Sequence, residues 1–446
     1  MAPDSKDMPK RYGWNTPVTA PGPDGGLMLR SIKAIIKDPL TYLTQSHADH
    51  GSNIQFPIPK PATYSISSAV GAREVLVAQQ QETTKQTLQY RNLALVTGEG
   101  LLTAETQAWR PRRRMLQPAF HREMVALTER HVIAGLAQLD KRWQIATEAG
   151  TAIVDMDEAM MTLALEITCN ALFGLDVSGE ATELTSATLT ALHGVVARAQ
   201  NPLALPIAIP TPNNSRMSRA IHRLDEAVSE IIQAREQDRL PSDSPIRDML
   251  DVLLDPDLEI PLTSKQIRDE IATFIVAGHE TVASALTWAW DLLVRNPCEL
   301  ERLREEPDRA QLIFDESLRL YPPAWVITRR TSADLEVEGI SIPAKSLVIV
   351  SPWVIHRNPE VWDQPLAFRP DRFSGGVPQV GYLPFGAGPR LCIGREMARL
   401  EGAMILRHIA SNWNLSAIHT GQTPIEASVT LRPVGGLPLR ISRLAN

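Results

Sequence analysis

Cysteine is scarce in this chain of 446 residues, which contains only three. So small and odd a number argues against a disulfide framework and fits a reducing compartment. The amino-terminal stretch MAPDSKDMPKRYGWNTP also lacks the apolar segment of a secretory signal peptide. We therefore expect a cytoplasmic location.

Long uncharged apolar runs are absent as well. The first apolar stretch is interrupted by Arg30, Lys33 and Lys37, whereas a bilayer span needs about 20 largely uncharged residues. The segment 271–294 is more apolar, but it carries the adjacent pair His279 and Glu280 near its middle, which would be costly in lipid. We expect a long helix through a protein core there, with no transmembrane anchor and no integral membrane association.

The chain has no Gly/Ser tract, low-complexity run or internal repeat, and its 34 prolines are scattered. Although this length would suit about three average domains, nothing marks a boundary, so we predict one domain over residues 1–446 with no fused reductase domain. The net charge of −6 argues against a generic nucleic-acid-binding protein.

The segment 385–394, FGAGPRLCIG, places Cys392 in a loop rich in glycine. Composition alone would produce F-x-x-G-x-R-x-C-x-G somewhere in this chain with a probability of about 10⁻⁵. Glycines let backbone N–H groups approach one sulfur and stabilise a thiolate. We expect Gly394 to adopt a positive φ where the loop enters a helix near Arg395. Cys169 and Cys298 have no such context and are interpreted as buried structural cysteines.

FGAGPRLCIG resembles the haem-binding loop of the cytochrome P-450 monooxygenases, including Phe385, Gly388, Arg390 and Gly394. The resemblance implies that Cys392 is the axial thiolate ligand of the iron of haem b, where it favours O–O bond cleavage. It implies a mainly α-helical fold with a smaller β-rich part, in which haem lies between a long central helix and the cysteine loop. The chain resembles the soluble bacterial type.

The segment Ala277-Gly278-His279-Glu280-Thr281 is unusual for a core helix, because glycine costs about 1 kcal/mol there and a buried glutamate must be paired, solvated or protonated. A purely structural interpretation has Glu280 held by a partner and Thr281 bonded to the carbonyl of Ala277. The segment also resembles the family's oxygen-binding motif. That resemblance implies that Ala277 and Gly278 leave room above the iron, and that Glu280 and Thr281 deliver protons.

Haem carries two propionates, so cationic and hydrogen-bonding partners are expected. Trp109 and Arg113 form W-x-x-x-R on neighbouring helical turns, which resembles the family's propionate-binding motif. Arg390 is a third candidate. Arg329 is a fourth, although the adjacent Arg330 leaves the choice between the two open.

Glu316 and Arg319 form E-x-x-R on one helix face, a weak signal by itself. With the later segment FRPDRF, it resembles a structural ion network of the family that includes Arg372. Asp371 departs from the family's commonest form, which has glutamate there.

Four arginines form a cationic cluster at 110 and 112–114. This cluster is either a solvated helix face or a docking patch for an acidic electron-transfer protein. The family resemblance implies electrons from NAD(P)H through an external ferredoxin or flavodoxin system.

The sequence says least about the substrate channel, and it does not identify the substrate. The near-alternating segments NIQFPIP, TYSISSA and LEVEGISIP predict short strands. The apolar loop 203–210 joins helices expected near 183–199 and 215–236, and is either a lid or membrane contact, or a packed loop. Residues 324–327 and the helix positions before Gly278 are apolar candidates for a pocket wall.

We predict a monooxygenase that inserts one atom of dioxygen into a hydrophobic small molecule, by hydroxylation or epoxidation. Peroxide-driven oxygenation on the same fold is an alternative, although the Glu280–Thr281 pair favours reductive activation of dioxygen. A haem or small-molecule binding protein without turnover is another, but such a protein needs no proton relay.

Overall fold

The structure is a computed structural model and describes residues 18–57, 62–177, 181–200, 204–237, 248–255, 258, 261–378 and 380–444. It divides into two compact units, each assembled from separate stretches of chain. The first comprises the chain up to Leu88, Leu318–Phe368 and Gly375–Cys392, and the second comprises Gln89–Ser317, Arg369–Ser374 and the chain from Ile393. The single domain expected from the sequence stays a prediction.

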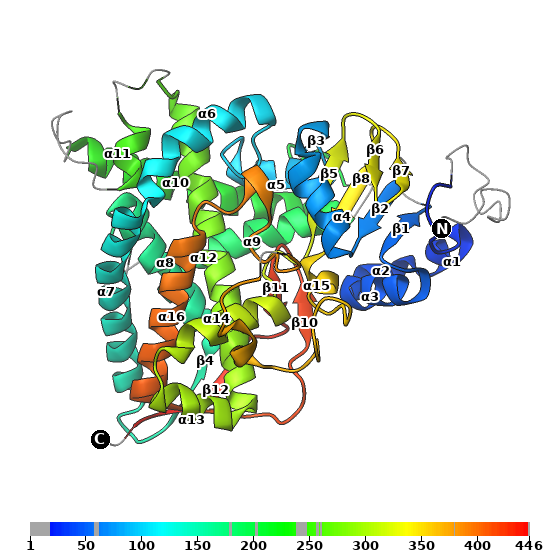
Figure 1. The fold of residues 1–446 in the computed structure, drawn as a ribbon. Coiled ribbons are helices and arrows are strands. Elements are labelled where there is room, and N and C mark those ends of the chain that lie inside the picture. The colour runs from blue at the N-terminus through cyan, green and yellow to red at the C-terminus, as the bar shows by residue number, and fades with distance from the viewer. Residues whose placement is uncertain are drawn as a thin grey trace. The chain divides into compact units, whose positions relative to one another are not determined.

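The first unit is built on a five-stranded sheet with the order β1-β2-β8-β5-β3. β2 and β8 are parallel and the other neighbours antiparallel, while β6 and β7 form a separate hairpin (Figure 1). The strands are β1 (Asn53–Phe56), β2 (Thr63–Ile66), β3 (Thr83–Thr84), β5 (Ile327–Thr331), β6 (Leu335–Val337), β7 (Ile340–Ile342) and β8 (Leu347–Val350). Each of the three segments predicted to form strands contains at least one of them, and residues 58 and 59 of the first segment lie outside the described residues.

Short helices complete this unit. They are α1 (Gly25–Arg30), α2 (Ile32–Lys37), α3 (Pro39–His50), α4 (Ala69–Arg73), α15 (Pro352–Ile355), the π-helix η1 (Glu74–Ala78), and the 3-10 turns η2 (Gln80–Glu82) and η5 (Gly388–Arg390). Apolar side chains of the two parallel strands, among them Tyr64, Ile66, Val348 and Val350, form the centre of its core.

The second unit is mainly helical. Its longer helices are α5 (Leu88–Thr97), α6 (Thr106–Leu116), α7 (Arg122–Ala146), α8 (Met156–Phe173), α9 (Ala181–Gln200), α10 (Pro212–Gln237), α12 (Ser264–Arg295), α13 (Pro297–Glu305), α14 (Arg309–Leu320) and α16 (Arg395–Asn412). The last three residues of α14, from Leu318, are assigned to the first unit. Shorter pieces are η3 (Gln117–Phe120), α11 (Met249–Leu253) and η4 (Pro370–Phe373). Figure 1 shows α7, α8, α12 and α16 running side by side, in agreement with their mutual contacts.

Two small sheets lie in the same unit. One has the antiparallel order β4-β12-β9, from β4 (Ala152–Asp155), β9 (Trp413–Ala417) and β12 (Pro438–Arg443). The other is the hairpin of β10 (Ile425–Ala427) and β11 (Leu431–Pro433). The three-stranded sheet unites residues that are far apart in the sequence, since β12 pairs with both β4 and β9.

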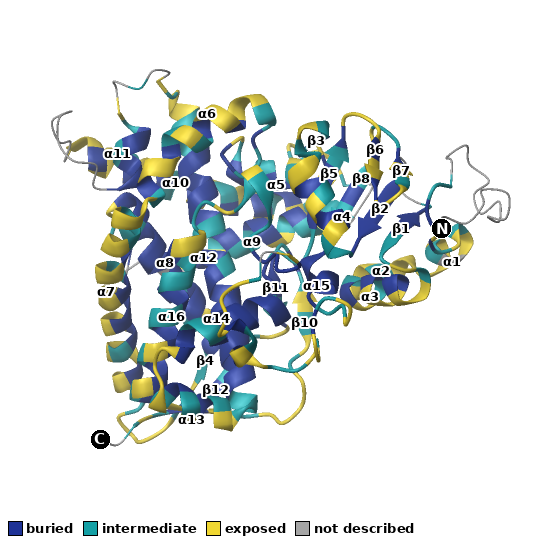
Figure 2. Cartoon of the chain, viewed as in Figure 1, coloured by how far each residue is buried: buried dark blue, intermediate teal, exposed yellow. Residues whose placement is uncertain are grey.

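Helix α12 begins at a capping box, in which the Thr263 hydroxyl accepts from the Gln266 N–H and the Gln266 side chain accepts from the Thr263 N–H. It ends before Pro297, which cannot donate the next helical bond. Its sequence is apolar on most sides, and it is buried over most of 271–293, whereas α7 exposes one side and buries the other (Figure 2). The core helix expected over 271–294 is confirmed and starts earlier, at Ser264.

Membrane-spanning segments are not found among the described residues: none of their helices combines sufficient length with sufficient apolar character.

The loop between α9 and α10 combines features of both interpretations made from the sequence. Leu205 and Ile209 are exposed, whereas Ile207 packs against the core of the second unit. Asn214 donates its side-chain amide to the carbonyls of Pro206 and Ile209 at 2.9 and 2.8 Å. The loop is therefore fastened at its backbone while two apolar side chains face solvent; Leu203 lies outside the described residues.

Candidate functional site

The cysteine loop is folded back on itself in the first unit. Gly386 and Gly388 have φ values of 74° and 70°, a conformation that favours glycine. The N–H of Cys392 donates to the carbonyl of Phe385 at 3.0 Å, and that of Leu391 donates to the carbonyl of Gly388 at 2.9 Å. Cys392 is exposed at the end of this loop, so its thiol is accessible to a ligand.

Gly394 does not have the positive φ that we predicted from the sequence. Its φ is −88°, which any residue can adopt. The chain enters α16 at Arg395 as expected, with the carbonyl of Gly394 accepting from the N–H of Ala398 at 2.9 Å. The prediction was wrong because the loop has already turned at Gly386 and Gly388.

Gly388 is the most constrained residue of this loop. A Cβ atom there would lie 2.3 Å from the carbonyl oxygen of Leu76, in addition to the strain of the positive φ. We expect Gly388→Ala to lower the free energy of unfolding by about 2–4 kcal/mol, measured by urea denaturation. Gly435→Ala, at φ 78° with nothing within 4 Å, is the control for strain alone and should cost about 1 kcal/mol. Equal losses in the two variants would contradict the steric account.

The same unit brings Arg329 and the cysteine loop to neighbouring elements. A Cβ built on Gly386 would contact Ile327 at the start of β5 at 3.8 Å, and β5 carries Arg329. Arg329 is 7% exposed, whereas the adjacent Arg330 is half-buried. One guanidinium nitrogen of Arg329 donates to the carbonyl of Thr328 at 2.9 Å. Among the described residues it has no carboxylate partner, so its charge is available to an anion.

Helix α12 of the second unit has an accessible patch on an otherwise buried stretch. Between residues 271 and 293, only Ala277, Gly278 and Thr281 are half-buried, and all the others are buried. The spacing places these three on one face. The Thr281 hydroxyl donates to the carbonyl of Ala277 at 2.7 Å. A Cβ at Gly278 would lie 2.8 Å from Cγ2 of Thr168, so this glycine also permits close packing against α8.

Glu280 is 2% exposed, and Oε1 of its carboxyl group accepts from the Thr430 hydroxyl at 2.9 Å. Burial raises the pKa of Glu280 to about 7, against the lowering effects of Thr430 and Arg432, and Asp157 raises it further. The two contacts of the purely structural interpretation, a partner for Glu280 and a bond from Thr281 to the carbonyl of Ala277, are therefore present. They leave Glu280 able to gain or lose a proton near neutral pH, which a transfer role requires.

Trp109 and Arg113 lie on successive turns of α6, where Trp109 is buried and Arg113 is half-buried. Side chains in the first turns of α12 contact both α6 and the segment of chain that precedes α6. Glu270 accepts from the N–H of Leu101 at 2.9 Å and from Arg112 at 3.2 Å. Burial raises the pKa of Glu270 to about 7, opposed by these two partners.

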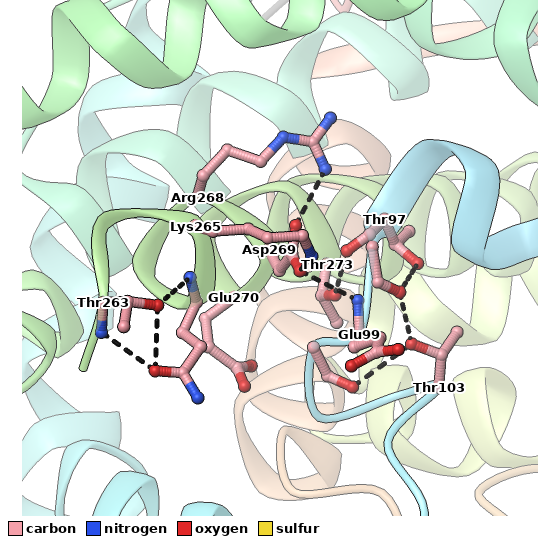
Figure 3. A network of polar contacts seen from close by, with 12 residues as sticks. Thr97, Glu99, Thr103, Thr263, Lys265, Arg268, Asp269, Glu270 and Thr273 are labelled. Atoms are coloured by element: carbon pink, nitrogen blue, oxygen red, sulfur yellow. Dashed lines mark hydrogen bonds and ion pairs between the residues drawn. The ribbon is translucent and has the colours of Figure 1, made fainter. Parts of the chain in front are cut away.

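Asp269 makes a second set of contacts with the same region. It accepts from the N–H of Glu99 at 3.0 Å, and from Lys265 and Arg268 at 2.6 and 3.3 Å (Figure 3). The polar beginning of α12, which sequence reasoning missed, thus positions the W-x-x-x-R helix.

The arginine cluster of α6 is smaller than the sequence indicated. Arg112 is buried in its ion pair with Glu270, so it belongs to the packing of the unit and not to a surface patch. Arg110 and Arg114 are exposed and Arg113 is half-buried. Three of the four arginines therefore remain candidates for contact with an acidic partner.

The ion network expected around Glu316 is confirmed for its pair with Arg372. Glu316 is fully buried; it accepts from Nε of Arg372 at 3.1 Å and from the N–H of Arg369 at 2.8 Å. Asp371 pairs instead with Arg302 and Arg309, at 3.2 and 2.8 Å. In the first unit, Arg319 donates to the backbone carbonyls of His356, Pro365 and Ala367. These residues are structural, as predicted.

A cytochrome P450 family model matches residues 21–437, nearly the whole chain. The chain belongs to the cytochrome P450 family. Haem b is accordingly its cofactor, and it is a monooxygenase that inserts one atom of dioxygen into a hydrophobic small molecule.

Several bacterial enzymes have related sequences, and their alignments with this P450 extend over most of its length. Cyclooctatin synthase of Streptomyces melanosporofaciens is 33% identical over 72% of this chain and 74% of its own length. Cyclooctat-9-en-7-ol 5-monooxygenase of the same organism is 30% identical over 98% of each chain. Pentalenene oxygenase of Streptomyces avermitilis is 29% identical over 90% of each.

Solved P450 structures share the fold. CYP175A1 of Thermus thermophilus has a TM-score of 0.76 and 32% identity, and the match covers 93% of this chain and 98% of that one. A six-coordinated cytochrome P450 from a second strain of Thermus thermophilus has a TM-score of 0.73 and 32% identity, covering 91% and 99%. The predicted P450 fold, mainly α-helical with a smaller β-rich part, is confirmed.

The residues of this P450 are chemically suited to haem. Cys392 offers an accessible thiol, and Arg329 is a buried cation without a carboxylate partner among the residues that the structure describes. Arg390 is half-buried in η5, within the cysteine loop. The half-buried positions of α12 carry small side chains and one hydroxyl.

Proposed function

We propose that Cys392 supplies the thiolate that binds the haem iron, with Phe385, Gly388 and Gly394 shaping the loop around it. The support is the loop's geometry, since the two positive-φ glycines return the chain so that Cys392 and Phe385 are hydrogen-bonded. Cys169 is unsuited to this role, because burial raises the pKa of its thiol to about 12.

The haem propionates bind Trp109, Arg113, Arg329 and Arg390 in this proposal. Arg329 has the strongest support, because a buried guanidinium is stable only beside an anion or hydrogen-bond acceptors. Trp109 and Arg113 present an indole N–H and a cation from neighbouring turns of one helix.

Glu280 and Thr281 are the proposed proton-delivery pair. The observation that carries this role is the combination of a buried acid with a pKa of about 7 and a half-buried hydroxyl beside it on α12. Haem, when bound, supplies the reductive activation of dioxygen. Glu280 exchanges protons with its surroundings, Thr281 directs one toward the reacting oxygen, and Ala277 and Gly278 leave room there.

The proposed substrate is a cyclic terpenoid. Support comes from three Streptomyces relatives, cyclooctatin synthase, cyclooctat-9-en-7-ol 5-monooxygenase and pentalenene oxygenase. Fatty acids are the second candidate class, because leukotriene-B4 omega-hydroxylase 3 of Mus musculus is 30% identical over 84% of this chain.

Electrons are proposed to come from NAD(P)H through a ferredoxin- or flavodoxin-type donor, with the exposed Arg110 and Arg114 of the arginine cluster as its docking contacts. The exposure of Arg110 and Arg114 supports this surface. The cytoplasmic location likewise stays a prediction.

A spectral screen of the ferric holoenzyme tests the substrate class. We expect cyclic terpenes to shift the haem from low to high spin, and fatty acids, steroids and aromatic polyketides to do so weakly or not at all. Compounds that bind are then incubated with a surrogate ferredoxin, its reductase and NAD(P)H, and products are identified by mass spectrometry. A shift from fatty acids alone would replace the terpenoid proposal. Product formed only with added peroxide would favour the peroxide-driven alternative, and binding without any product would favour the non-catalytic one.

A further inference from the structure

One face of α12 carries polar side chains although it is completely buried. Glu280, Ser284, Thr287 and Trp288 follow the spacing i, i+4, i+7, i+8, and each is at most 2% exposed. Buried polar groups are retained where they have hydrogen-bond partners. The partners of this face come from α8 and from the hairpin of β10 and β11.

Strand β11 is fixed to this face by its first residue. The carbonyl oxygen of Leu431 accepts two hydrogen bonds from α12, from the Ser284 hydroxyl at 2.6 Å and from the Trp288 indole N–H at 2.9 Å. These donors are four residues apart, so they lie one turn above the other. The position of β11 along the helix is thereby defined.

The residues on either side of Leu431 contact the acid and its surroundings. Thr430 is 2% exposed and donates its hydroxyl to Oε1 of Glu280 at 2.9 Å. Arg432 pairs with Asp157, at the beginning of α8. Asp157 also accepts from the Thr287 hydroxyl at 3.2 Å. The ion pair of Arg432 and Asp157 is thereby linked to α12.

Two charged groups, Arg432 and Asp157, act on Glu280. Arg432 favours the carboxylate form and Asp157 opposes it, so the two have opposite effects on the same group. His279, next to Glu280 on α12, is fully buried, and burial lowers the pKa of its imidazole to about 4. It is therefore neutral at neutral pH, and Arg432 and Asp157 are the charges that act on Glu280.

We propose that the β10–β11 hairpin positions the catalytic acid: Thr430 fixes the orientation of the Glu280 carboxyl group, and the Arg432–Asp157 ion pair holds the hairpin and α8 against the same face of α12. Thr430, Arg432 and Asp157 are positioning residues, since they act through Glu280. The assignment rests on the proposed role of Glu280 in proton delivery.

Infrared titration of the full-length holoenzyme tests the proposal directly. The protonated carboxyl band of Glu280 is assigned by its loss in Glu280→Gln and followed between about pH 5 and 9. In Thr430→Val, which keeps the shape of the side chain, we expect the midpoint to rise by about one pH unit, because a hydrogen bond to the carboxylate is lost. Thr430→Ser should restore the original midpoint.

Variants of the Arg432–Asp157 ion pair test the direction in which the titration midpoint of Glu280 moves. Arg432→Gln is expected to raise the midpoint of Glu280, and Asp157→Asn is expected to lower it, whereas simple loosening of the hairpin would move both in the same direction. The control is Thr423→Val, which removes a hydroxyl that donates to Asp291 at 2.6 Å, just before β10 and away from Glu280. It should leave the midpoint unchanged. If either ion-pair variant fails to fold, the Thr430 variants still test whether the hairpin positions Glu280.

The outcomes separate this inference from the proposed function. A midpoint that is unchanged in Thr430→Val would overturn the positioning role, even if Glu280→Gln still reduced the product formed per NAD(P)H. A shifted midpoint with undiminished coupling in Glu280→Gln would confirm the positioning and overturn the proton-delivery role. We expect a shifted midpoint in Thr430→Val together with a shift of its coupling–pH profile in the same direction.

Discussion

Replacing Cys392 by alanine is expected to abolish the thiolate-type haem spectrum and to reduce monooxygenase turnover to background. In the proposal Cys392 is the sulfur ligand of the iron, and a thiolate ligand donates the electron density that favours O–O cleavage. The measurement is the absorption spectrum of the ferrous carbon monoxide complex, together with product formation in the reconstituted system.

Cys298 provides the matched control for this prediction. The burial expected for Cys298 was wrong: it is exposed, because it lies at the beginning of α13, outside the motif. Cys298→Ala should keep the thiolate-type spectrum and the turnover of the parent enzyme. A thiolate-type spectrum that persisted in Cys392→Ala would show that the ligand had been assigned to the wrong residue.

Replacing Thr281 by alanine is expected to keep haem binding and to divert reducing equivalents to peroxide. A positioned proton donor contributes about 10²–10⁴-fold to catalysis. We therefore expect the product formed per NAD(P)H consumed to fall by about tenfold or more. The measurement is the ratio of product to peroxide at equal NAD(P)H consumption.

Thr281→Ser distinguishes the hydroxyl group from the methyl group at this position. It keeps a donor that can bond to the carbonyl of Ala277, as Thr281 does at 2.7 Å, and should retain most of the coupling. If Thr281→Ala coupled electrons to product as well as the parent does, the hydroxyl would have no part in proton delivery.

Local patterns predicted the elements that carry the site. The apolar run 271–294 indicated a core helix, because a helix that is apolar on most sides must be buried. The cysteine motif located a tight loop followed by a helix at Arg395. The prediction for Gly394 was wrong because the motif shows which residues are glycine but not which of them make the turn.

Contacts between distant residues could not be predicted in this way. Thr430 bonds to Glu280 across 150 residues, and a lone threonine beside a short strand gives no local signal. Arg112 looked like one of four surface arginines until its buried partner Glu270 was placed beside it, 158 residues away. A periodic pattern shows which side of an element is buried, but it does not identify the partner.

The attachment of β11 to α12 also determines when this enzyme can finish folding. Trp288 and Leu431 are separated by 143 residues, which a ribosome adds in about 7–30 s at ~5–20 residues per second. During that interval, the acid and the indole of α12 have been synthesised but their hairpin has not. Newly made α12 therefore has to remain hydrated or be held by a chaperone until almost the whole chain has emerged, and a messenger truncated before Leu431 would leave this helix face without the acceptor that Ser284 and Trp288 share.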